Sequence, residues 1–163
     1  TKIDKRTWER MQVDYLQVFK FLTDKLLRKE KVFCMDFKQK LSILSQKTIR
    51  THGCEAGRAN FIVDEQGRYF ACQNMLPYEA SIGNLDNGID STKRNRYKSQ
   101  FVREMENCQQ CWARYLCGGG CQTERIFNTS SLSTYCDISR FEWEQILQAH
   151  IYLQCKKETE EKS

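Results

Sequence analysis

The sequence predicts an α+β fold in which a small β-hairpin and cysteine-rich loops are flanked by α-helices. Three observations support this expectation. Both ends of the chain show helical periodicity, a hairpin pattern occupies its middle, and six of its nine cysteines lie in the second half. The 163 residues suit one domain, or one domain with an extension.

Composition narrows the classes of function. Hydrophobic residues make up 40% and charged residues 29%, an ordinary balance for a folded chain. A formal charge of +5 is too small to require a nucleic-acid or membrane partner. No apolar run approaches the roughly 20 residues that span a bilayer, and no secretory signal opens the chain. We therefore expect a cytoplasmic protein, and the start at Thr1 rather than at methionine suggests a piece of a longer one.

The first helix is predicted over residues 7–29. Its apolar side chains recur at three- and four-residue steps, which places them on one face. They are Trp8, Met11, Tyr15, Val18 and Leu22. Such an apolar and aromatic face is typical of packing in a core. A second, weaker helical pattern covers residues 36–50.

A β-hairpin is predicted in NFIVDEQGRYFAC, residues 60–72. The flanking residues are β-branched or aromatic, and Gly67 ends the turn, where glycine tolerates a positive φ. The hairpin has a consequence for chemistry, because it folds Cys72 back toward the segment that carries Cys54. One more short strand is expected in the turn-rich stretch at 75–88.

The rest of the chain predicts two more helices and a loop. Residues 91–106 look helical, with Asp90 as the N-cap, and lead directly to Cys108. A polar loop is expected over 127–135. Asp137 is predicted to cap the last helix. The apolar residues of that helix are Trp143, Ile146, Leu147, Ile151 and Leu153.

The cysteines favour metal binding over disulfides. An odd number of cysteines without an export signal argues against a closed disulfide framework, although it leaves one open. Cys108 and Cys111 form a CxxC pair whose sulfurs can face one metal centre, and Cys117 follows five residues later. The three glycines at 118–120 allow a sharp turn and a close backbone approach, after which Cys121 can face a different site.

The whole pattern reads C-x12-G-x4-C, then C-x2-C-x5-C-x3-C, then one more cysteine. It resembles the SPASM domain, which carries auxiliary iron–sulfur clusters at the C-terminus of many radical SAM enzymes that mature ribosomally made peptides and proteins. The resemblance covers about residues 50–140 and includes IGN at 82–84. It implies that residues 46–163 form the auxiliary domain, and that residues 1–45 are a helical connection from, or the end of, an upstream radical SAM core.

The resemblance implies two [4Fe-4S] clusters with interleaved ligands. The first would take Cys54, Cys72 and Cys121, and the second would take Cys108, Cys111, Cys117 and Cys136. The first cluster lacks a fourth ligand. An open iron site that binds a substrate thiol is the preferred expectation, with Cys34 or His52 as alternatives. Cys155 lies outside the motif, and we interpret it as an ordinary helix cysteine.

Zinc is the alternative metal. Four thiolates from Cys108, Cys111, Cys117 and Cys121 are enough for one tetrahedral site, which would make the chain a structural or interaction module without catalysis. Such a site leaves the hairpin cysteines and Cys136 unexplained.

The expected function follows from the resemblance. No CxxxCxxC occurs in the chain, so these residues cannot cleave S-adenosylmethionine, and whether the chain counts as an enzyme stays open. The resemblance implies a partner radical SAM domain in cis, which would bind S-adenosylmethionine. It also implies a peptide substrate, for which a cysteine-containing peptide is favoured, and an oxidoreductase role in electron transfer or thiol binding. A nucleic-acid partner is not expected.

Overall fold

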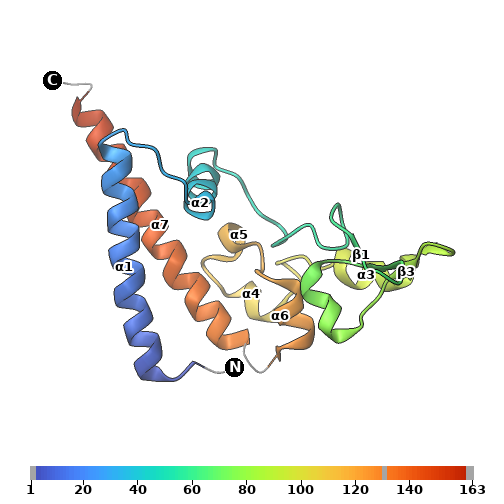
Figure 1. The fold of residues 1–163 in the computed structure, drawn as a ribbon. Coiled ribbons are helices and arrows are strands. Elements are labelled where there is room, and N and C mark those ends of the chain that lie inside the picture. Colours follow the sequence, from blue (N-terminus) through green and yellow to red (C-terminus); the bar gives the residue numbers. More distant parts are fainter. Residues whose placement is uncertain (1–2, 130–131, 161–163) are drawn as a thin grey trace. The chain divides into compact units, whose positions relative to one another are not determined.

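A computed structural model of the chain describes residues 3–129 and 132–160, and shows two compact units. Residues 1–49 and 133–163 form unit 1, and residues 50–132 form unit 2. Figure 1 shows long helices in unit 1, and short helices with a small sheet in unit 2. The mixture of helices with an antiparallel sheet confirms the predicted α+β class.

Unit 1 contains three helices: α1 (Lys5–Leu27), α2 (Met35–Ser45) and α7 (Leu132–Glu160). Helices α1 and α7 run in the same direction (Figure 1). They lie side by side, because Trp8 and Tyr15 of α1 both contact the ring of Phe141 in α7. The ring centroids of Phe19 and Phe37 lie 5.7 Å apart, and this contact joins α1 to α2. Aromatic contacts therefore hold the three helices together.

Helix α1 confirms the helix predicted from residue 7, with one correction to its buried face. The Asp4 carboxylate caps the helix by accepting the backbone N–H of Thr7, at 2.9 Å. Leu22 is buried as expected, whereas Val18 is 52% exposed. Phe19 makes the inter-helix contact instead, because it lies one position further round the helix on the side of α2.

Helix α7 begins earlier than the sequence predicts, and this is the main error in that region. The predicted loop over 127–135 ends where α7 begins at Leu132, so Asp137 lies inside the helix and accepts a hydrogen bond from Arg140. No glycine or proline between Leu132 and Asp137 interrupts the helix. Trp143 and Ile146 are fully buried as predicted, but Ile151 is 59% exposed.

The sheet of unit 2 confirms the hairpin and adds two strands to it. Four strands pair antiparallel in chain order: β1 (Ile62–Val63), β2 (Arg68–Phe70), β3 (Gly83–Asn84) and β4 (Gly88–Ile89). Gly67 has a φ of 73° and donates its amide to the Asp64 carbonyl, as the turn requires. Strand β3 is the additional strand expected at 75–88, and β4 was not foreseen.

Short helices complete unit 2. They are the 3-10 helix η1 (Gln73–Tyr78), α3 (Ser91–Lys98), α4 (Glu106–Gln109), α5 (Arg114–Cys117) and α6 (Gln122–Phe127). Asp90 caps α3 as predicted, but α3 ends at Lys98 rather than continuing to residue 106. The chain turns there because the amide of Val102 donates to the carbonyl of Thr51, a bond that a continuing helix would forgo.

A compact apolar core lies beneath the sheet of unit 2. Its buried members are Ala56, Phe70, Ala71, Met75, Ile82 and Tyr97. Cys54 and Cys72, both partly buried, pack against this core. In the described residues, no helix combines the length and the apolar character needed to cross a membrane.

Candidate metal centre

The glycine turn at 118–120 is the point on which the cysteine segments of unit 2 converge. All three glycines have positive φ, at 71°, 91° and 73°. A Cβ on Gly118 would lie 2.4 Å from the carbonyl oxygen of His52, and one on Gly53 would lie 2.0 Å from that of Gly120. The turn therefore packs backbone to backbone against residues 52–53, and only glycine permits this approach.

Hydrogen bonds from Arg50 fix the same contact. The Arg50 amide donates to the Tyr115 carbonyl at 2.8 Å. Its guanidinium donates to the carbonyl of Leu116, at 3.4 Å, and to that of Gly53. Cys54 follows Gly53 directly, so these bonds hold the Cys54 segment beside the turn between Cys117 and Cys121.

Cys72 reaches the same neighbourhood through the hairpin. The amide of Gly57 donates to the carbonyl of Ala71 at 3.3 Å, which joins the Cys54 segment to the hairpin end. The Cys72 sulfur lies 3.5 Å from the hydroxyl oxygen of Thr123, a buried residue two positions after Cys121. The segments of Cys54, Cys72 and Cys121 are thus brought together, as the first predicted ligand set requires.

Cys108, Cys111 and Cys117 form a second group. The Cys111 amide donates to the Cys108 carbonyl at 3.0 Å, which closes the CxxC turn. Burial raises the pKa of the Cys108 thiol, the thiols of Cys117 and Cys111 raise it further, and the charge of Arg125 opposes the rise. The Arg114 amide donates to the Cys111 carbonyl at 3.2 Å and the Cys117 amide donates to the Ala113 carbonyl at 2.8 Å, so consecutive short turns join the three cysteines.

Arg125 links the two groups of cysteine segments. Its Nη2 donates to the Cys108 sulfur at 3.0 Å, and its Nε donates to the carbonyl of Gly119 within the glycine turn. A guanidinium that donates to sulfur favours the thiolate form, which is the form that binds metal. The sequence reasoning missed Arg125, because its role depends on the way α6 turns back toward Cys108.

The remaining three cysteines belong to unit 1. Cys136, predicted for the second cluster, is in the second turn of α7. Cys34, the alternative fourth ligand, is the exposed N-cap residue of α2, and Cys155 is an exposed residue of α7. His52 pairs its Nε2 with Glu55 at 2.9 Å, so the structure gives this histidine another partner.

The packing of unit 2 brings the cysteine-bearing segments together, but it does not arrange the side chains of the described residues around one metal ion. All nine cysteines lie in the described residues, and none forms a disulfide. Across residues 3–129 and 132–160, no group of three or more His, Cys, Asp or Glu side chains is arranged to hold a metal ion. The ligand sets consequently stay predictions, supported by the packing of the segments that carry them.

Unpartnered buried atoms provide a test of whether a metal cluster fits here. Within the described residues, the buried side-chain nitrogens and oxygens without a hydrogen-bond partner are Arg58 Nε and Nη2, and Gln122 Nε2 and Oε1. Arg58 follows Cys54 by four residues, and Gln122 follows Cys121 directly. Buried donors normally have acceptors. The guanidinium of Arg58 lies over the ring of Phe101, 4.7 Å from its centroid, so these unpartnered donors do not mark a cluster site.

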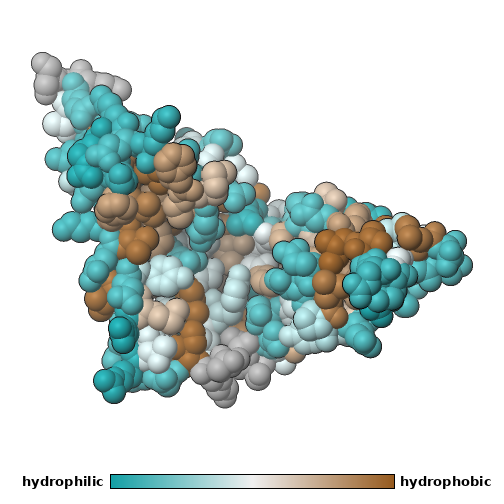
Figure 2. All heavy atoms as spheres, viewed as in Figure 1, coloured by the Kyte–Doolittle hydropathy of each residue, from teal (hydrophilic) through white to brown (hydrophobic). Residues whose placement is uncertain are grey.

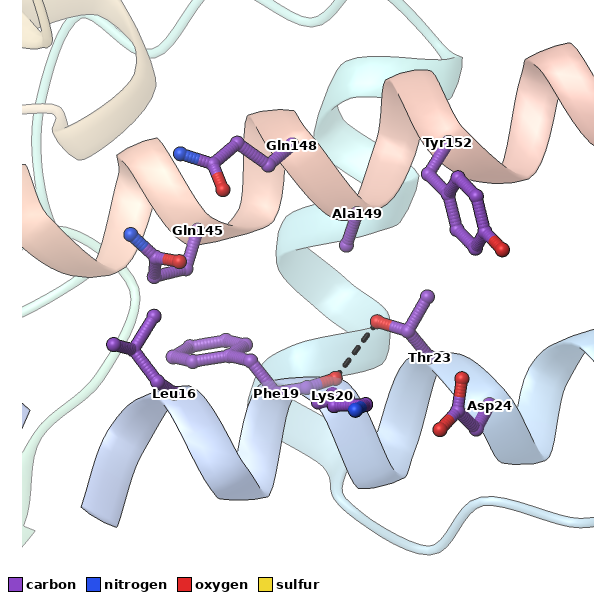
Figure 3. Close-up of a pocket in the computed structure, with 9 residues that line it drawn as sticks. All are labelled: Leu16, Phe19, Lys20, Thr23, Asp24, Gln145, Gln148, Ala149 and Tyr152. Atoms are coloured by element: carbon purple, nitrogen blue, oxygen red, sulfur yellow. Dashed lines mark hydrogen bonds between the residues drawn. The ribbon is translucent and has the colours of Figure 1, made fainter. Parts of the chain in front are cut away.

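Unit 1 contains a groove of a different kind. Its volume is about 450 Å³, and side chains of α1 and α7 line it (Figure 3). Lys20 and Asp24 lie on one wall, Gln145 and Gln148 on the other, and the Thr23 hydroxyl donates to the Phe19 carbonyl at 2.7 Å. The lining has no cysteine or histidine. This groove therefore offers no alternative metal centre.

Comparison of the chain with known protein families, with curated proteins and with solved structures finds no match. The cysteine spacing and the packing around the glycine turn therefore carry the functional argument.

Proposed function

We propose that the chain is the auxiliary cluster-binding part of a radical SAM maturase that modifies a ribosomally made peptide or protein. The observation that carries this proposal is the meeting of the Cys54, Cys72 and Cys121 segments at the glycine turn. These segments are up to 67 positions apart in sequence, since 121 − 54 = 67. A metal site made of Cys108, Cys111 and Cys117 alone would not require the segments of the other three cysteines to meet.

The residues would divide between two [4Fe-4S] clusters. Cys54, Cys72 and Cys121 would hold the first, and Cys108, Cys111 and Cys117 would hold the second, with Cys136 as its fourth predicted ligand. Such clusters, when bound, transfer single electrons, and one with an open iron also binds a thiolate. The chain itself would bind and shield them. Arg125 would donate to the Cys108 sulfur, while the core around Phe70 would limit the access of water.

The rest of the maturase activity belongs to the proposed partners. An upstream domain in cis would bind and cleave S-adenosylmethionine, because this chain lacks the necessary cysteine motif. The substrate would be a peptide, and a cysteine in that peptide would suit the open iron of the first cluster. Oxidoreductase chemistry on a ribosomally made peptide is the reaction class we infer.

Electron paramagnetic resonance tests this function directly. The chain is purified without oxygen, reduced with dithionite and measured with and without a cysteine-containing peptide. We expect two reduced-cluster signals, of which the peptide changes one, while a peptide with serine in place of cysteine changes neither. A protein that contains zinc and no sulfide, and gives no such signal, would contradict the proposal and favour the structural zinc module.

A further inference from the structure

Helix α3 concentrates positive charge on the surface of unit 2. Four of its eight residues are basic and none is acidic. Arg94 has a structural role, because its guanidinium donates to the backbone carbonyls of Gly57 and Arg58. Lys93 and Arg96 are exposed, and neither forms an ion pair within the described part of the chain. The charge of these two side chains is therefore available to a partner.

The helix itself does not compensate the charge of Lys93 and Arg96. The two residues lie three positions apart, on one face of the helix, where like charges repel. The helix macrodipole favours Arg96 in the last turn but disfavours Lys93 in the first. Asp90 supplies the nearest carboxylate in the sequence, and it accepts backbone N–H groups at the cap. A negatively charged partner would turn this unfavourable arrangement into a favourable one.

A pair of stacked aromatic rings adjoins Arg96. The Cζ atom of Arg96 lies 5.8 Å from the ring centroid of Phe127 in α6. The rings of Phe127 and Tyr78 are stacked with centroids 4.3 Å apart, and the Tyr78 hydroxyl donates to Oδ1 of Asn128 at 3.0 Å. A guanidinium held over a ring loses little side-chain entropy when its N–H groups bind a carboxylate. Tyr78 is 38% exposed, so it offers apolar surface close to this charge.

We propose that Lys93, Arg96 and Tyr78 form a docking surface for an acidic segment of a polypeptide. Carboxylates of the segment would accept hydrogen bonds from the two basic side chains, and an apolar residue between them would pack on the Tyr78 ring. A peptide is favoured over a nucleic acid, because Phe127 already contacts Tyr78 and Arg96, whereas a base needs an open ring face. The surface contains no cysteine, so this inference goes beyond the proposed function and does not depend on bound metal.

Fluorescence anisotropy of a labelled peptide tests this surface. The probe is a fluorescein-labelled peptide of glutamates with one phenylalanine, and it is titrated with the full chain at low salt, where exposed charges are least screened. We expect Lys93→Gln combined with Arg96→Gln to bind the probe about tenfold more weakly, the effect of losing one hydrogen bond between charged groups.

The matched control combines Lys31→Gln with Lys38→Gln. It removes the same charge from exposed residues of unit 1, and it should keep the affinity of the wild-type chain. Equal losses in the two double variants would overturn the proposal, since they would mean that only net charge matters. A wild-type chain that does not bind the probe, or that binds a uridine oligonucleotide more tightly, would overturn it as well.

A second measurement uses the wild-type chain, and it decides the case if the variants fold poorly. A carbodiimide couples glutamates of the bound probe to lysine side chains as amides, and mass spectrometry of the digested product locates them. We expect Lys93 to couple in preference to Lys31 and Lys38. Equal coupling at the three lysines, or coupling confined to lysines outside α3, would overturn the proposal.

Discussion

Gly53 is a position in unit 2 at which the backbone leaves no room for a single methyl group. A Cβ at this position would lie 2.0 Å from the carbonyl oxygen of Gly120, far inside van der Waals contact, and a backbone atom cannot move aside as a side chain can. We expect Gly53→Ala to lower the free energy of unfolding by about 3 kcal/mol, the upper end of typical overpacking costs. Chemical denaturation measures this loss.

Gly88 provides the control for Gly53. It has a φ of 71°, but a Cβ there would meet no atom within 4 Å. Gly88→Ala should therefore show only the cost of a left-handed alanine, about 1 kcal/mol. Equal losses for the two variants would mean that the contact between Gly53 and the glycine turn is not needed.

The cysteines separate into predicted ligands and exposed residues, and this difference is testable. We expect Cys72→Ser to lose the first cluster and about half of the iron, because each cluster holds four iron atoms. Cys34→Ser and Cys155→Ser should keep all of it, since both residues are exposed and lie in unit 1. Iron analysis of the variants purified without oxygen measures the effect. Loss of iron in Cys34→Ser would instead identify Cys34 as the fourth ligand.

At the residue scale, the spacing of the cysteines was readable from the sequence, but the residues around them were not. Gly67 provides the positive φ of the hairpin turn, and Asp90 caps the first turn of α3. Both act on neighbouring residues, so their roles follow from residue type. Arg125 and Gln122 act through tertiary packing. Nothing in the sequence near them indicates that one meets the sulfur of Cys108 and that the other is buried without a partner.

At the scale of the elements, only one of the two aspartates predicted to cap a helix does so. Asp90 accepts the backbone N–H groups of Thr92 and Lys93 at the start of α3, whereas Asp137 lies inside α7 and pairs with Arg140. We expect Asp90→Ala to lower the free energy of unfolding by about 1 kcal/mol, as the loss of an N-cap does. Asp137→Ala should lower it by only about 0.3 kcal/mol, the value of an exposed helix pair.

Urea denaturation of the two aspartate variants decides between these roles. The reverse order of losses would mean that the last helix begins at Asp137, as the sequence alone predicts.

The sequence places helices well where apolar periodicity is strong, as in α1. It fails at the start of α7 and at the end of α3, because the pattern there gives no stop signal and contacts such as Val102 with Thr51 decide.

Lys40 of α2 connects this helix to α7 through an ion-pair network. Its Nζ lies 2.7 Å from Asp36 and 2.9 Å from Glu142 of α7. Burial alone would lower the pKa of Lys40, but the hydrogen bonds that Lys40 donates to Asp36 and Glu142 outweigh it, and the net effect raises this pKa. Burial, together with the Glu142 carboxylate, also raises the pKa of Tyr15 in α1.

Both shifts predict that unit 1 loses stability at high pH. A group whose pKa is raised by folding contributes stability below its unfolded pKa, and this contribution is lost as the pH rises through the folded value. We expect the thermal stability to fall above a pH of about 10, where unfolded Tyr and Lys begin to lose their protons. Circular dichroism at increasing pH measures it.

The matched variants for this network are Lys40→Met and Lys38→Met. Lys40→Met leaves Glu142 without its cation, so we expect it to cost about 2 kcal/mol near neutral pH, within the range for hydrogen bonds to charged groups. It should also flatten the alkaline fall in stability. Lys38 of the same helix is exposed, and its replacement should change neither quantity. An alkaline fall of the same size in Lys40→Met would mean that other groups cause it.

At the scale of the whole molecule, the two units differ in the kind of structure that they contain. Unit 1 has a helical core around Trp143 and Phe37, and its surface carries apolar patches (Figure 2), with Val13, Phe21 and Phe33 all more than half exposed. Unit 2 holds most of the predicted ligands in a part with short elements and a small core. Under the proposed function, metal–thiolate bonds would add to the stability of unit 2, whose helices and strands are short.

The central claim is that these thiols gather around two iron–sulfur clusters, and quantifying iron and acid-labile sulfide tests it most directly. The chain is isolated without oxygen, and both elements are measured per mole of protein. We predict about eight of each, four for each cluster. A protein that contains zinc without sulfide, or neither iron nor sulfide, would contradict the account.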